Sequence, residues 1–118
     1  MSDHSPLSIE SIGDVKHIRF RDRQIEHDAI MQIQQETLQL IKQQQPPKIL
    51  LDFQQVDYLP TTGLGMLVSI QTSTHRKNGQ LRLANLQTLI RETLRVSRLD
   101  QILDIHDTTE SALASFES

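Results

Sequence analysis

Two short runs of alternating apolar and polar residues begin the chain. Their apolar positions are Leu7, Ile9, Ile12, Val15, Ile18 and Phe20. Apolar residues at every second position are typical of a strand with one buried face, and Gly13 with Asp14 between the runs suits a tight turn. Residues 7–20 are therefore predicted to form a β-hairpin.

Residues 28–45 have the pattern of an amphipathic helix. The stretch lacks Gly and Pro and is rich in good helix formers. Its inward-facing residues are expected to be Ile30, Ile33, Leu40 and Ile41, which recur at helical spacing. Asp28 is the expected N-cap, and Pro46 with Pro47 is expected to end the helix.

An uninterrupted apolar run comes next. Ile49, Leu50 and Leu51 stand side by side in the stretch 48–53, as in a strand that is buried on both faces. The remaining pattern predicts helices at 62–75 and 88–96, strands at 81–86 and 102–105, and a last helix that Thr108 or Thr109 caps. Such alternation favours parallel strands joined by right-handed crossovers.

The predicted fold class is therefore α/β. We expect one domain over residues 1–118, with an ordered core at about 7–117. The sheet should be mixed and mostly parallel, with four or five strands and about four helices packed on it. The first six residues and the last two are expected to be loose.

Composition narrows the classes of function. The chain has no cysteine, which excludes disulfides and thiolate metal sites and fits a reducing compartment such as the cytoplasm. Residues 1–7 are too polar for a signal peptide, and the longest apolar stretch, 64–70, is far short of the ~20 residues of a membrane helix. The net charge of −3 lacks the basic surplus of a nucleic-acid binder, and Arg19, Arg21 and Arg23 are interpreted as a solvated strand face.

Candidate catalytic groups are few. His27 precedes Asp28, but adjacent residues on a helix do not face each other, so a catalytic pair is disfavoured. His106, next to Asp107, ends a predicted strand and is interpreted as a surface strand end. Asp52 ends the buried strand, where many enzymes place an acid, yet no base or nucleophile stands beside it. We expect Asp52 to accept hydrogen bonds from loop amides, and the protein to be no enzyme and to need neither cofactor nor metal.

The turn Pro60-Thr61-Thr62-Gly63 places two hydroxyls at the start of a helix. One interpretation is structural, with Thr61 or Thr62 as the N-cap and the glycine allowing close packing. The other is functional, because a helix N-terminus offers free N–H groups and a positive dipole to a phosphate. Phosphorylation would add roughly −1.5 to −2 charges and would block a partner without unfolding the domain.

A family resemblance bears on this choice. Residues 48–65 are similar to the signature of the STAS domain family, the anti-sigma factor antagonists of bacteria. The signature is an aliphatic strand ending in Asp, a Val-x-Phe/Tyr-hydrophobic loop, and an Asp-Ser-Ser/Thr-Gly-Leu-Gly turn. The matching segments are Ile49-Leu50-Leu51-Asp52, Val56-Asp57-Tyr58-Leu59 and Pro60-Thr61-Thr62-Gly63-Leu64-Gly65. The resemblance continues in order over about residues 7–117.

The resemblance implies a partner-switching function in signal transduction and transcription regulation. Thr61 matches the residue that is phosphorylated in the family, with Thr62 as the fallback, and the partner would be an anti-sigma factor that is itself a serine/threonine kinase. The implied partner surface is Pro60, Thr61, Thr62, Gly63, Gly65 and Met66. Pro60 stands where the family has Asp. Two alternatives stay open: a non-switching STAS scaffold module, and a STAS domain that senses a small ligand.

Overall fold

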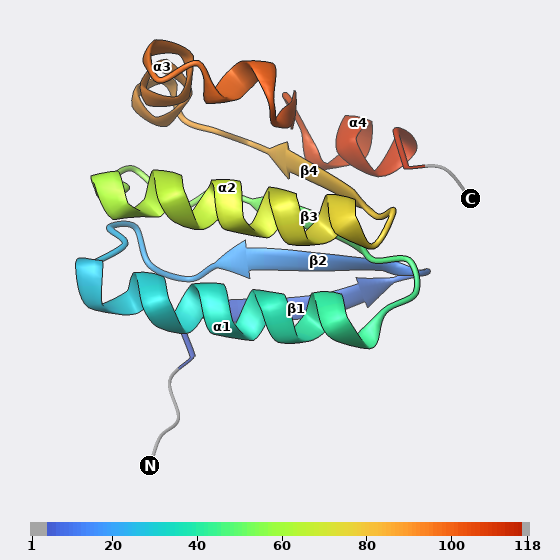
Figure 1. Ribbon diagram of the computed structural model, residues 1–118. Helices are drawn as coiled ribbons and strands as arrows, with labels where there is room; N and C mark the ends of the chain where they lie inside the picture. The colour runs from blue at the N-terminus through green and yellow to red at the C-terminus, as the bar shows by residue number, and fades with distance from the viewer. Residues whose placement is uncertain (1–4, 117–118) are drawn as a thin grey trace.

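Five strands form one sheet in the order β1-β2-β3-β4-β5 (Figure 1). The computed structural model describes residues 5–116. The elements are β1 (Leu7–Ile12), β2 (Val15–Phe20), α1 (His27–Gln43), β3 (Lys48–Asp52), α2 (Thr61–Arg76), β4 (Gln80–Ala84), α3 (Thr88–Val96), the 3-10 helix η1 (Leu99–Gln101), β5 (Asp104–His106) and α4 (Thr109–Ala114). Only β1 runs antiparallel to its neighbour, so the predicted α/β class with a mixed, mostly parallel sheet is confirmed.

Helices cover the two faces of the sheet unequally. Helices α1 and α2 lie side by side across one face (Figure 1), and the buried residues of α3 join the same core. The short helix α4 covers part of the other face through Ala112. Among residues 5–116, no helix has both the length and the hydrophobicity needed to cross a bilayer.

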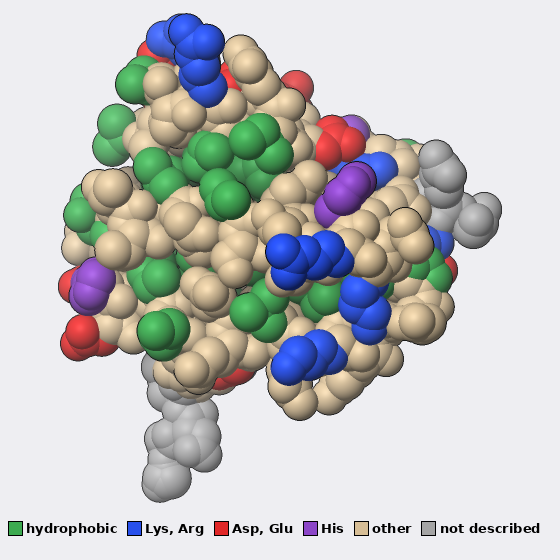
Figure 2. Space-filling model, viewed as in Figure 1, with side chains coloured by type: hydrophobic (Ala, Val, Ile, Leu, Met, Phe, Trp, Pro, Cys, Tyr) green, Lys and Arg blue, Asp and Glu red, His purple; other side chains and the backbone are tan. Residues whose placement is uncertain are grey.

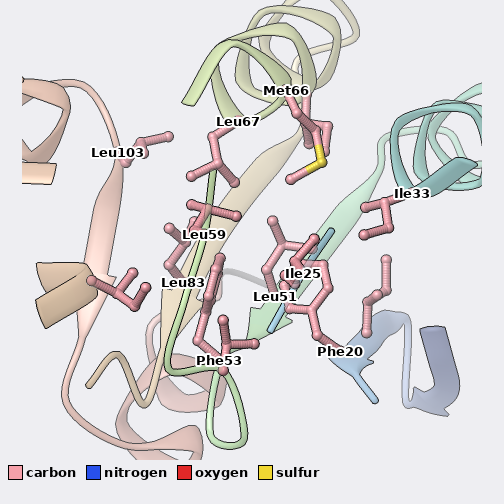
Figure 3. Packing of buried hydrophobic residues seen from close by; sticks show 14 of the residues in the cluster. Phe20, Ile25, Ile33, Leu51, Phe53, Leu59, Met66, Leu67, Leu83 and Leu103 are labelled. Atoms are coloured by element: carbon pink, nitrogen blue, oxygen red, sulfur yellow. The ribbon is translucent and has the colours of Figure 1, made fainter. Parts of the chain in front are cut away.

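Strand β3 lies in the middle of the sheet and is buried throughout. Ile49 and Leu51 face the large core beneath α1 and α2, where Phe20 and Phe53 pack with their ring centroids 4.7 Å apart (Figure 3). Leu50 faces the smaller cluster beneath α4. The three adjacent aliphatic residues thus serve two cores, which confirms the prediction of a central strand buried on both faces.

The ends of α1 differ from the prediction. The helix begins at His27 with Glu26 as the N-cap, so Asp28 lies in the first turn, where its charge complements the helix dipole. The helix stops at Gln43, two residues earlier than expected. A residue that precedes proline disfavours the helical conformation, so Gln45 is excluded from the helix. The chain already leaves the helix at the C-cap, Gln44.

The C-terminal part differs more. The expected strand at 102–105 is displaced to Asp104–His106, because η1 intervenes and leaves Ile102 exposed. Helix α4 is capped by Thr108, one of the two expected residues, with Ser111 completing a capping box.

The start of the chain also differs from the expectation. Ser5 donates a hydrogen bond to Glu36 (2.9 Å), and the Pro6 carbonyl accepts one from the Arg21 amide (3.0 Å), so neither residue is loose. Residues 1–4 and 117–118 lie outside the described residues.

Truncation of Leu50 tests the double burial of β3. Leu50→Ala should lower the free energy of unfolding by ~2–5 kcal/mol, because a cavity opens where the side chain was fully buried. Ile102→Ala, at a side chain that is 54% exposed, is the matched control and should cost less than ~1 kcal/mol. Urea unfolding measures both values. A similar small loss for both variants would contradict a central, doubly buried β3.

Candidate functional site at the start of helix α2

The loop between β3 and α2 is anchored from beneath. Phe53, Val56 and Leu59 are buried at intervals of three residues. Backbone hydrogen bonds tie the loop to the segment after β2: the Asp57 amide donates to the Arg23 carbonyl (2.7 Å), and the Ile25 amide donates to the Tyr58 carbonyl (3.1 Å). The loop therefore holds a fixed path to the first residue of α2.

Leu59 and Gly63 make the close contact that sets the turn. A Cβ at position 63 would lie 2.5 Å from Leu59 Cδ1, well inside van der Waals contact. The Gly63 amide also donates to the Pro60 carbonyl (2.8 Å), which begins the helix. Glycine at position 63 is thus required by packing, as the structural interpretation of the turn proposed.

The two threonines are the first residues of α2, and both are exposed. The N-cap is Pro60, so the expectation that Thr61 or Thr62 caps the helix is wrong. The physical reason is that the Pro60 carbonyl already accepts the first bond of the helix, which places both threonines inside it. Their hydroxyls therefore lie at the helix end, where backbone N–H groups lack intrahelical acceptors.

A groove of about 480 Å³ runs from this helix end between α1 and α2. From α1 it is lined by His27, Ile30, Met31 and Gln34. From α2 it is lined by Thr61, Thr62, Gly65 and Met66. His27 Nδ1 lies 3.2 Å from Thr62 Oγ1, within hydrogen-bonding distance, so a residue that adjoins Asp28 in sequence faces the other helix instead.

The structure brings together most of the surface implied by the sequence. Thr61, Thr62 and Gly65 are exposed, and Pro60 is half-buried. Gly63 and Met66 are buried and support this surface from below. The α1 side of the groove was missed by sequence reasoning, although Met31, 63% exposed on an otherwise polar face, was the signal that could have indicated it.

Asp52 belongs to a separate polar cluster. It is 1% exposed and accepts hydrogen bonds from the Gln54 amide and the Asn85 side chain, both at 2.9 Å, while His17 Nε2 lies 2.9 Å from its other oxygen. Burial alone would raise the pKa of Asp52, but the hydrogen bonds from Asn85, Gln54 and His17 outweigh it and lower the pKa. The expectation that Asp52 accepts hydrogen bonds from loop amides is confirmed, and an ionised carboxylate held so firmly is a structural anchor.

The other charged candidates form ion pairs. The expected surface position of His106 is wrong: the residue is half-buried, and its Nε2 atom is buried 3.1 Å from an Asp104 oxygen without a well-aligned hydrogen bond, because the side chain packs at the end of β5. Asp107 is exposed and pairs with Arg91 at 3.0 Å. Of the expected arginine face, Arg19 alone is on β2, because the strand ends at Phe20. Within residues 5–116, no three His, Cys, Asp or Glu side chains gather closely enough to hold a metal ion.

Comparison with known proteins identifies the family. The family model for the STAS domain matches residues 7–112 of the sequence. The chain belongs to the STAS domain family. The match spans the sheet, the loop after β3 and the turn at Thr61.

Several solved structures share the fold. An anti-sigma-factor antagonist (STAS) domain protein from Planctomyces limnophilus is 21% identical, over 92% of this chain and 96% of that one, with a TM-score of 0.84. An anti-sigma factor antagonist from Mycobacterium paratuberculosis is 17% identical, over 92% and 91%, with a TM-score of 0.82. The Bacillus cell fate determinant SpoIIAA in its phosphorylated form is 20% identical, over 92% and 96%, with a TM-score of 0.71.

The two glycines at the start of α2 in this STAS chain offer a paired test. Gly63→Ala should destabilise the protein by about 1–3 kcal/mol, because the new Cβ displaces buried Leu59. Gly65→Ala should stabilise it by about 0.5–1 kcal/mol, because its Cβ would meet no atom of the described residues within 4 Å and alanine favours a helix. Thermal and urea unfolding of both variants give the comparison. Equal effects of the same sign would refute the Leu59–Gly63 contact.

Proposed function

We propose that the protein is an anti-sigma factor antagonist-like switch that binds a kinase-type anti-sigma factor. Binding occurs while Thr61 is unmodified, and phosphorylation of Thr61 releases the partner. The chain itself performs no catalysis in this scheme, since the partner supplies both ATP and the kinase activity. Both proteins meet in the cytoplasm of a bacterial cell.

The observation that carries the proposal is the exposed Thr61 side chain at the first residue of α2. A kinase must reach the hydroxyl with its own active site, so exposure is the first requirement. The position also matches the family's phosphorylated residue in the turn. The phosphorylated form of SpoIIAA, which has the same fold, adds support.

The electrostatics of the turn suit a phosphate. The first turn of α2, residues 61–64, is uncharged, and a helix N-terminus stabilises negative charge with its backbone N–H groups. The modification therefore changes the surface charge while the fold beneath it persists.

A second candidate function is a STAS scaffold that binds partners without switching. Pro60 favours it, because the family's Asp is missing from the turn that a cognate kinase would recognise. In that case Thr61 and Thr62 contribute only to the contact surface. The two functions differ in whether charge at position 61 controls binding.

Charge at position 61 tests the switch. Thr61→Glu should leave the fold intact, because an acidic group suits a helix N-terminus, but should weaken binding of the kinase-type partner roughly thirtyfold or more. Thr61→Ala should bind as the original does. Isothermal titration calorimetry with the purified partner gives the affinities.

A matched variant separates local from general charge effects. Thr72 is exposed on the same helix, about three turns further on, so Thr72→Glu adds the same charge away from the turn and should change the affinity little. If Thr61→Glu binds as tightly as Thr72→Glu, the switch is wrong and the scaffold function is favoured.

A further inference from the structure

No contact within the described residues explains why position 65 is a glycine. Its neighbour Gly63 is needed because Leu59 lies against it, but a Cβ on Gly65 would meet no atom of the described residues within 4 Å. Gly65 lies within α2, where glycine disfavours the helical conformation relative to alanine. The missing side chain leaves open space over the backbone of α2, which a group outside the chain can approach.

The space above Gly65 is the groove between α1 and α2. Ile30, Met31 and Met66 give it apolar walls, and Thr61 lies at its end. The described residues that line it carry no carboxylate, Lys or Arg, and His27 is the only titratable group among them. Lys and Arg side chains gather instead at the other end of the two helices, where Lys42 and Arg76 lie (Figure 2).

We propose that this groove, with Gly65 as its floor, receives one large apolar side chain of the Leu, Met or Phe type from the kinase-type partner. The proposal rests on the proposed function and adds to it the recognition pocket. An uncharged lining matches an uncharged side chain, because a charged one would lose its hydration without gaining a counter-charge. Because Thr61 is part of the groove lining, the inserted side chain would come from the protein that must also reach the Thr61 hydroxyl.

The pocket also explains how one phosphate would release the partner. Docking an apolar side chain in the groove covers the adjoining edge of Thr61 and removes water from it. A phosphate dianion there would have to lose hydration on docking, which is strongly unfavourable. Release would then follow from desolvation at the edge of the groove, without any change of backbone conformation.

Filling the groove tests the pocket. The probe is the ATP-binding protein of kinase type that the unmodified chain captures from lysate of its own cells, identified by mass spectrometry and then purified. Gly65→Leu should weaken its binding roughly thirtyfold or more, because the new side chain occupies the pocket. Its melting temperature should not fall, which shows that the fold is intact. Thr72→Leu adds the same bulk to the same helix outside the groove and should bind within about threefold of the original.

A spectroscopic readout gives an independent check. Two of the three methionines, Met31 and Met66, line the groove, so a chain labelled with ¹³C at its methionine methyls reports on the pocket directly. Adding the partner should shift both signals.

Each result decides between the pocket and its alternatives. Tight binding by Gly65→Leu with unmoved methyl signals would overturn the pocket and leave the proposed function standing. Failure of the original chain to bind any kinase-type protein would overturn both. A dimer of the original chain that Gly65→Leu dissociates would give the groove to a second copy and contradict the proposal.

Discussion

Burial of β3 on both faces is the constraint on which the rest of the structure depends. Leu51 and Leu50 commit the strand to two different cores, so β3 cannot move to an edge of the sheet without exposing one of them. The chain then leaves the sheet at a fixed point, and Phe53 and Leu59 continue the core into the loop. Leu59 packs beside Gly63, and the Pro60 carbonyl accepts the Gly63 amide, so α2 begins at the threonines and their side chains are left on the surface.

The parallel arrangement brings two helix ends together. Helices α1 and α2 both return the chain from the same edge of the sheet, so His27 and Thr62, 35 residues apart in sequence, come within hydrogen-bonding distance. The region around Thr61 thus combines a positive helix end with an apolar groove. A phosphate is favourable there while the surface is open to water, and an apolar side chain is favourable there once a partner covers the surface. The two cannot be present together, because covering a phosphate would remove its hydration. That incompatibility is the physical basis of the proposed switch.

Local sequence patterns predicted most of the fold. They failed where contacts between residues distant in the sequence determine the local structure. The triple aliphatic run predicted β3, and the motif around Thr61 predicted the exposed turn, because both signals are contiguous. The strand after η1 was misplaced because Ile102 is a residue type that favours strands. In the structure, the left-handed Arg98 (φ 64°) leads into a 3-10 helix that displaces Ile102 from the sheet. The Pro60 cap and the α1 wall of the groove depend on contacts across the fold. For the α1 wall, an apolar Met31 on a polar helix face was a signal, but it does not show which element lies beside it.

Phosphoryl transfer to the chain tests the central claim most directly. The purified kinase-type partner, incubated with the chain and Mg-ATP, should add one phosphoryl group, and tandem mass spectrometry of the peptides should place it on Thr61. Thr61→Ala should then remain unmodified. A partner that binds the chain and hydrolyses ATP, yet transfers no phosphoryl group to Thr61 or Thr62, would contradict the switch.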